Sequence, residues 1–135
     1  MFKKFITALF VSTSALTIAG CASESTIVEV ANESGTSQAF SASVETVSAA
    51  AASTLTDLGL NLKDTTTADS GAVTLVFSKP VSAFSWGEVG KILISPAANG
   101  AQVTVISRTR AAIQLFGTTQ TTFAEQIFAG ISGKL

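Results

Sequence analysis

Apolar residues recur at every third or fourth position between Ser41 and Leu58, which is the spacing of one face of an α-helix. The stripe consists of Val44, Val47, Ala51, Leu55 and Leu58. Ser41 or Ser43 can cap the start of this helix. Gly59 is well placed to end it, because glycine readily adopts the left-handed conformation found after helices. We therefore predict a helix over residues 41–58.

Alternating polarity after this helix predicts two β-hairpins. The first joins Leu60–Thr66 to Ala72–Ser78 through the turn sequence Ala68-Asp69-Ser70-Gly71. The second joins Trp86–Ser95 to Ala101–Thr109 through Pro96-Ala97-Ala98-Asn99-Gly100, which contains the strong hairpin signal Asn-Gly. Four strands that follow one another in this way favour an antiparallel sheet.

The register of the second hairpin is restricted by its apolar residues. The isoleucines of one strand share a face with the valines of the other only if paired residue numbers sum to an odd value. A sum of 199 uses a two-residue turn but sets Lys91 directly opposite Arg108, which is unfavourable. A sum of 197 avoids that contact with a four-residue turn, so we favour 197.

A second amphipathic helix is predicted at the C-terminus. Thr122-Phe123-Ala124-Glu125 has the pattern of a capping box, in which a Thr and a Glu satisfy the first backbone N–H groups. Gly133 is placed to end the helix. Its buried stripe consists of Phe123, Ile127, Phe128 and Ile131.

The segment Met1–Gly20 has the pattern of a secretory signal peptide. Lys3 and Lys4 form a short basic segment, and a mostly apolar stretch follows over Phe5–Ile18. A membrane-spanning helix needs about 20 apolar residues, so this stretch is too short to span a bilayer and matches a signal sequence.

Ile18-Ala19-Gly20-Cys21 follows directly and resembles the lipobox of bacterial lipoproteins. The resemblance implies cleavage between Gly20 and Cys21, with the Cys21 thiol receiving diacylglycerol and the mature chain carrying acyl groups such as palmitate. Ala22 after the cysteine implies export to the outer membrane, facing the periplasm, if the organism has two membranes. The membrane is therefore the first expected partner.

Polar residues dominate after Cys21, and we expect residues 21–40 to form a tether with Thr26–Val30 as an edge strand. A flexible tether of about 18 residues spans roughly 25 Å. The predicted organisation is a signal peptide over residues 1–20, the lipidated cysteine and tether over 21–40, and one small domain over 41–135.

The predicted fold class is α+β. It is a two-layer sandwich in which an antiparallel sheet of four to five strands carries two helices on one face, in the order β-α-β-β-β-β-α. This order of elements is similar to that of a family of small bacterial lipoproteins of unknown function: a helix, then Leu58-Gly59-Leu60, two hairpins and a terminal amphipathic helix. The resemblance covers residues 40–135 and supports the fold, but it implies no activity.

Composition limits the chemistry. The sequence contains no His and no Tyr, and Cys21 is its single Cys. This excludes Ser-His-Asp and Cys-His catalytic arrangements. It also excludes zinc sites with His or free Cys ligands and an intrachain disulfide. Without the signal peptide, the chain has six basic and nine acidic residues, and this net negative charge does not favour nucleic-acid binding. We predict no cofactor and no metal.

The segment around Trp86 is the most distinctive candidate site. Trp86 lies next to Gly87, with Gly90 nearby, and could form a ligand platform with Glu88 as its polar partner. Alternatively, Trp86 lies at the edge of the core and the glycines allow a bulge or a wide strand entry. We favour the second interpretation.

The second candidate is a cationic group on the sheet. Lys91, Arg108 and Arg110 share the face away from the apolar core in either register, whereas Glu88 lies on the core face. These cations could bind a phosphate, a lipid headgroup or a cell-wall carboxylate. Alternatively, they form a solvated face that discourages strand pairing, and we favour that interpretation.

Two weaker candidates remain. The loop Gln114–Thr122 could hold an anion at a helix N-terminus, although its hydroxyls more often cap and turn. Asp57, Asp64 and Asp69 are acidic, but nothing in their spacing requires a pair of catalytic carboxylates.

We therefore expect a membrane-anchored envelope lipoprotein that acts as a non-enzymatic interaction or structural module, with an envelope protein or cell-wall partner. The alternative is a module that binds a small ligand or an anion through Trp86 and the cations.

Overall fold

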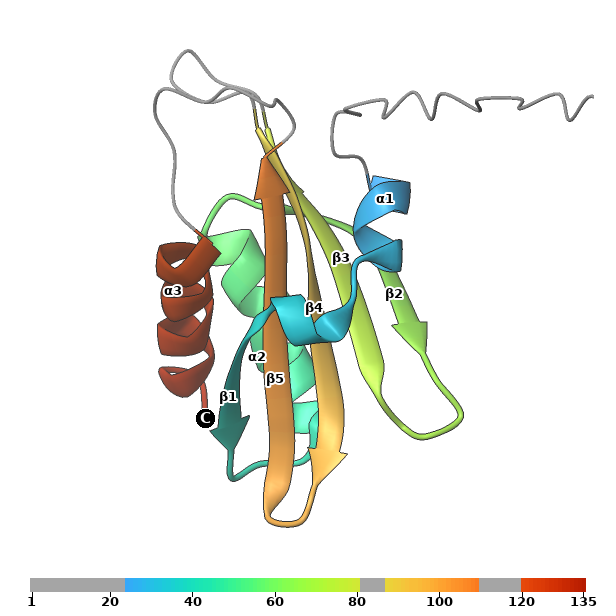
Figure 1. Ribbon diagram of the computed structural model, residues 1–135. Coiled ribbons are helices and arrows are strands. Elements are labelled where there is room, and N and C mark those ends of the chain that lie inside the picture. The colour runs from blue at the N-terminus through green and yellow to red at the C-terminus, as the bar shows by residue number, and fades with distance from the viewer. Residues whose placement is uncertain (1–23, 81–86, 110–119) are drawn as a thin grey trace, which may run out of the picture.

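The computed structural model describes residues 24–80, 87–109 and 120–135, and their strands form one antiparallel sheet of five strands (Figure 1). The elements in chain order are α1 (Glu24–Glu29), the 3₁₀ helix η1 (Asn32–Ser34), β1 (Thr36–Phe40), α2 (Val44–Asp57), β2 (Asn61–Thr67), β3 (Val73–Lys79), β4 (Glu88–Ala97), β5 (Gly100–Thr109) and α3 (Gln120–Ser132). The α+β class with an antiparallel sheet is confirmed.

The strands are arranged in the order β1-β5-β4-β3-β2, so that β1 and β2 are the two edges. Helices α2 and α3 pack on one face of the sheet, as expected, while α1 and η1 lie over the opposite face (Figure 1). The sheet is therefore covered on both faces over part of its length. All of β2 is exposed to solvent, as is typical of an edge strand.

The main core lies between the sheet and helices α2 and α3. Its buried sheet residues include Leu75, Phe77, Ile92, Ile94, Val103 and Val105. Phe77 stacks on Phe123 of α3, with ring centroids 5.6 Å apart and planes 3° apart, and Phe40 meets Phe128 at 6.2 Å. Fully burying one such side chain contributes about 1.5–3 kcal/mol, so this layer supplies most of the driving force for folding.

Helix α2 begins and ends close to the expected residues. Ser43 is the N-cap, and its hydroxyl accepts a hydrogen bond from the Thr46 amide at 3.2 Å. Gly59 adopts a φ of 70° directly after the helix, in the left-handed region that glycine tolerates. Both ends of this helix follow from local sequence chemistry.

The second hairpin has the favoured register. Ile94 pairs with Val103, and Lys91 lies opposite Ile106, so that residue numbers sum to 197. The expected four-residue turn is wrong, because pairing continues to Ala97 and Gly100 and leaves only two residues between them. Gly100 allows this continuation with a φ of 144°, a value that other residues rarely adopt.

The N-terminal expectations are wrong in their details. Thr26–Val30 is not an edge strand, because helix α1 occupies Glu24–Glu29, and the edge strand is β1, ten residues later. The order therefore begins with α1 and η1 before β1. Ile27 is 1% exposed whereas Val28 is 53% exposed, and Val30 packs against the same cluster as Ile27. Residues three positions apart, such as Ile27 and Val30, lie on the same side of a helix but on opposite faces of a strand. Their packing in one cluster therefore fits a helical segment and not a strand.

Helix α3 starts earlier than its capping-box pattern predicts. The helix begins at Gln120, so Thr122 lies inside the first turn and is not the N-cap. The expected buried stripe is confirmed, with Phe123, Ile127 and Ile131 each at most 3% exposed. No helix in the described part of the chain is long and apolar enough to cross a membrane.

Candidate functional site

The structure separates the residues that the sequence suggested as a site. Trp86 and Arg110 lie outside the described residues. Glu88 and Lys91 belong to β4, and Arg108 belongs to β5. Glu88 is 2% exposed and shares the core side of the sheet with Ile92, whereas Lys91 and Arg108 share the opposite face. Glu88 is therefore not part of the same surface as the two cations.

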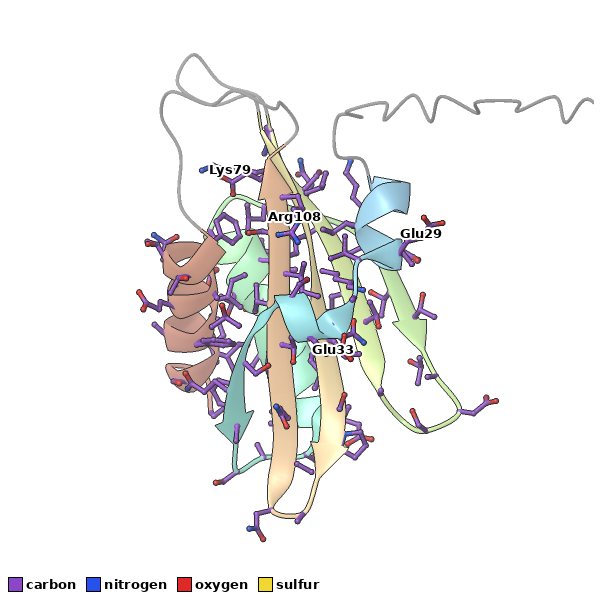
Figure 2. The ribbon with its side chains drawn as sticks, viewed as in Figure 1. Glu29, Glu33, Lys79 and Arg108 are labelled. Carbon is purple, nitrogen blue, oxygen red and sulfur yellow. The ribbon has the colours of Figure 1, made fainter. Side chains whose placement is uncertain are left out.

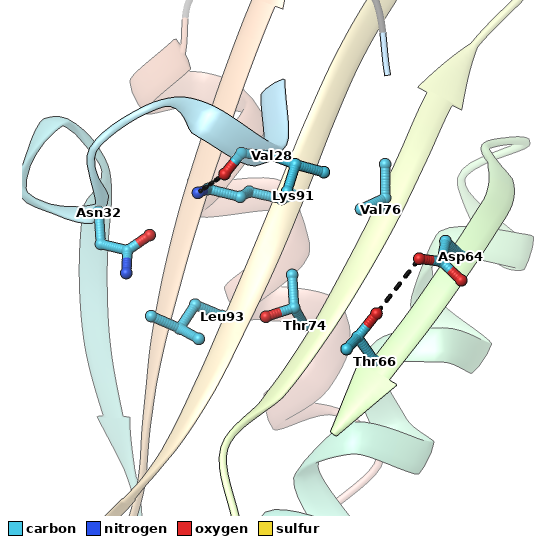
Figure 3. Close-up of a pocket in the computed structure, with 8 residues that line it drawn as sticks. All are labelled: Val28, Asn32, Asp64, Thr66, Thr74, Val76, Lys91 and Leu93. Atoms are coloured by element: carbon cyan, nitrogen blue, oxygen red, sulfur yellow. Dashed lines mark hydrogen bonds between the residues drawn. The ribbon is translucent and has the colours of Figure 1, made fainter. Parts of the chain in front are cut away.

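Lys91 is buried beneath the N-terminal helix. Its side chain is only 5% exposed, and its ammonium group donates a hydrogen bond to the backbone carbonyl of Val28 at 3.0 Å (Figure 3). It donates a second hydrogen bond to the carbonyl of Val30 at 2.7 Å. These carbonyls lie at the C-terminal end of α1, where a cation also interacts favourably with the helix dipole. In this structure Lys91 holds α1 on the sheet, and the expected solvated face is covered at this point.

Burial has an electrostatic consequence for Lys91. Removing the ammonium group from water lowers the pKa of Lys91 below its ordinary value of 10.5, and the nearby carboxylate of Glu33 opposes this shift. A buried cation is tolerated here because it is hydrogen-bonded to two carbonyl oxygens and faces a carboxylate.

Apolar contacts complete the attachment of α1. Ile27 packs into a small cluster with Val76, Val89 and Ile106, one residue from each of the three central strands. We call this set the outer cluster. All four side chains are at most 3% exposed, so the outer cluster is a second hydrophobic layer on the opposite face from the main core. Ile27 and Lys91 together make α1 part of the folded domain.

A shallow groove of about 270 Å³ runs beside α1 on the same face (Figure 3). Its lining residues are Val28, Asn32, Asp64, Thr66, Thr74, Val76, Lys91 and Leu93. Within it, the Thr66 hydroxyl donates a hydrogen bond to the Asp64 carboxylate at 3.2 Å. The groove is slightly smaller than most ligand pockets, whose volumes begin at about 300 Å³. The Lys91 ammonium in its wall is engaged by α1.

Gly90 has a packing role that explains part of the glycine pattern near Trp86. A Cβ at Gly90 would overlap the ring of Phe77 on the neighbouring strand, so only glycine lets that ring lie across β4. Gly87 has a φ of 86° just before the strand begins. These two glycines therefore serve the entry and packing of β4, while Trp86 itself lies outside the described residues.

Two further basic side chains, those of Lys79 and Arg108, lie at one end of the sheet. Figure 2 shows Lys79 at the end of β3 and Arg108 near the end of β5, at the end of the sheet from which the chain enters α1. Arg108 is exposed, and Lys79 is partly exposed. Glu29 and Glu33 lie on the α1 and η1 side of the sheet (Figure 2).

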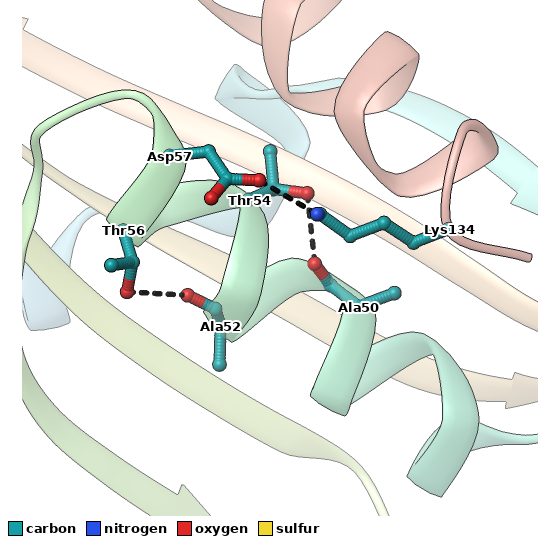
Figure 4. A network of polar contacts seen from close by, with 6 residues as sticks. All are labelled: Ala50, Ala52, Thr54, Thr56, Asp57 and Lys134. Carbon is teal, nitrogen blue, oxygen red and sulfur yellow. Dashed lines mark hydrogen bonds and ion pairs between the residues drawn. The ribbon is translucent and has the colours of Figure 1, made fainter.

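The three aspartates do not share a site. Asp57 at the end of α2 forms an ion pair with Lys134 at 2.6 Å (Figure 4), Asp64 lies on β2, and Asp69 lies in the turn after β2. Within the described ranges, no group of three acidic or other metal-ligating residues could hold a metal ion.

The polar loop before α3 is covered only in part. Residues 114–119 lie outside the described residues, and residues 120–122 form the first turn of α3. Its suggested role in anion binding stays a prediction.

The comparisons with known proteins give no relative on which to model the site. No protein-family model matches the chain, and neither a curated protein nor a solved structure does. The feature that sequence reasoning missed is the docking of α1, for which the spacing of Ile27 and Val30 was the available signal.

Proposed function

We propose that this chain is a cell-envelope lipoprotein, anchored through Cys21, whose domain acts as a non-enzymatic interaction or structural module. The observation that carries the proposal is the order of features from Met1 to Cys21: two lysines, a short apolar stretch and Ile18-Ala19-Gly20-Cys21. Several acyl chains give stable anchoring, whereas a single chain is marginal.

The domain supports the proposal in two ways. It has a hydrophobic core between the sheet and two helices, and it needs no disulfide, since the sequence has a single cysteine. Its edge strand β2 is exposed along its whole length and polar in sequence, which offers backbone groups to a protein partner while limiting aggregation.

Anchoring is tested with the Cys21→Ser variant, compared with Ser23→Ala as a matched control near the same site. We expect the wild type and Ser23→Ala to incorporate labelled palmitate and to fractionate with membranes, and Cys21→Ser to lose both. Palmitate labelling that persists in Cys21→Ser contradicts the proposal.

The non-enzymatic role has a separate test. A photo-crosslinker placed at Leu62, an exposed apolar side chain of β2, is compared with one at Leu135 near the end of the chain. We expect one envelope protein or cell-wall component to be captured at Leu62 and not at Leu135. A Cys21-free domain that turns over an envelope substrate, and stops when one carboxylate is replaced, contradicts the proposal.

Binding of a small ligand or an anion remains the second candidate function. Arg108 supports it as an exposed cation, whereas the engagement of Lys91 by α1 weakens it. Titration of Trp86 fluorescence with envelope glycans and lipid headgroups distinguishes the two, since only a ligand-binding module should show a saturable change.

A further inference from the structure

We propose that the end of the sheet carrying Lys63, Lys79 and Arg108 faces the anionic headgroups of the membrane to which the chain is anchored. This inference rests on the proposed lipidation of Cys21. It adds an orientation and a contact surface to the anchor. We call these three residues the basic end.

The first step is the length of chain between the anchor and the domain. Helix α1 already includes Glu24, which is three residues after Cys21. Three residues span at most about 10 Å even when fully extended. A tether reaching to residue 40 would have let the domain tumble, whereas this short link keeps the start of α1 close to the bilayer surface.

The second step is that α1 is fixed to the sheet. Ile27 is buried in the outer cluster, and Lys91 holds the carbonyls of Val28 and Val30. The position of Cys21 therefore limits the orientation of the whole sheet and not only that of a loose segment.

The third step is the location of the basic end. In the strand register, Lys79 lies opposite Glu88 at the start of β4, and Arg108 lies opposite Val89. Both basic residues are therefore at one end of the ladder. Lys63 lies in the irregular stretch between Leu62 and Asp64, near the start of β2. The chain enters α1 at this same end (Figure 2).

The two ends of the sheet differ in their basic residues. The basic end also carries carboxylates: Glu29 of α1 is exposed, Asp64 follows Lys63 on β2, and Glu88 is 2% exposed and lies opposite Lys79 in the ladder. Asp57, in the helix layer, is paired with Lys134. At the opposite end, the turns at residues 68–72 and 97–100 carry Asp69 and no basic residue. The short link to Cys21 therefore sets the orientation, and the three cations of the basic end are the groups that anionic headgroups can then contact.

The test uses the mature chain from Cys21, coupled through its thiol to a maleimide phospholipid in vesicles. Every contact described above is made by residues from Glu24 onward, so this chain retains all of them. Because coupling is chemical, the test reads orientation even if lipidation in cells fails. Lysine acylation is then followed by mass spectrometry on vesicles that contain phosphatidylglycerol, and on the same chain in solution.

We expect Lys63 and Lys79 to lose most of their reactivity on these vesicles, while Lys134 keeps its reactivity. Replacing Lys79 and Arg108 with Gln should weaken binding of the unanchored chain to the same vesicles by about fivefold per residue, and Lys134→Gln should not. Equal protection of all three lysines, protection of Lys134 alone, or equal binding to vesicles of phosphatidylcholine only would overturn the proposal.

Discussion

The ammonium group of Lys91 and the carbonyl oxygen of Val30 lie 2.7 Å apart, which joins the middle of strand β4 to the segment that follows helix α1. Residues 61 positions apart in the chain are thereby connected across the outer face of the sheet. This bond, together with burial of Ile27, makes the segment after Cys21 part of the domain.

Replacing Lys91 with Met should loosen α1. The variant keeps an apolar stem of similar length but leaves the carbonyls of Val28 and Val30 without their donor, which costs about 1–3 kcal/mol of unfolding free energy. Amide hydrogen exchange should then accelerate more over residues 24–35 than in β4 and β5. Lys63→Met, on the exposed strand β2, is the control. Equal exchange in the two variants would count against the role of Lys91.

Replacing Ile27 with Ala should have a larger effect than the same change at its neighbour. Ile27 is 1% exposed in the outer cluster, and truncation of a buried Ile typically costs about 2–5 kcal/mol, so a loss of this size is expected. Val28 is 53% exposed, and Val28→Ala should change stability by no more than about 0.5 kcal/mol. Urea denaturation measures both, and similar losses would show that α1 is not docked through Ile27.

Burial of Lys91 should make stability depend on pH in a defined direction. Its pKa is lowered in the folded state, so below 10.5 the unfolded chain binds more protons at this residue. The free energy of unfolding therefore rises with pH between the lowered pKa and 10.5. The difference between wild type and Lys91→Met should grow in favour of the wild type over this window. A difference that is flat or falls with pH would contradict the burial of this group.

Replacing Gly130 with Ala should destabilise the packing of α3 on α2. A Cβ at Gly130 would overlap the side chain of Thr54, which is 1% exposed and whose hydroxyl donates to the Ala50 carbonyl at 2.8 Å. Overpacking of this kind costs about 1–3 kcal/mol, which exceeds the helix-propensity gain of roughly 1 kcal/mol.

Two further variants test whether the loss in Gly130→Ala comes from overlap with Thr54. At Gly133 a Cβ would lie no closer than 3.5 Å to its neighbours, so Gly133→Ala should leave the melting temperature almost unchanged. Thr54→Ala in the Gly130→Ala background should recover part of the loss. Additive losses in the double variant would mean that the two residues do not meet.

The elements best predicted from sequence are those whose signals are local. Ser43 and Gly59 bound α2 through their own backbone preferences. The apolar alternation of β4 and β5 restricted their register to odd sums, and avoidance of Lys91 opposite Arg108 selected the observed sum of 197. The turn between these strands was not predicted, because the conformation of Gly100 extends the pairing.

The N-terminal segment shows why the rest could not be predicted. Ile27, Val28 and Val30 fit a strand as well as a helix when considered alone. The choice depends on the outer cluster, which exists only after three strands have been placed in register. The role of Lys91 depends on the same assembly, since sequence alone gave it an exposed position.

The mass of the N-terminal peptide of the protein purified from membranes tests the central claim most directly. The account predicts that this peptide begins at Cys21 and carries the added mass of diacylglycerol on its thiol, with any further acyl group on the amine. A peptide that begins at another residue, or one that contains Cys21 with a free thiol, would contradict the account.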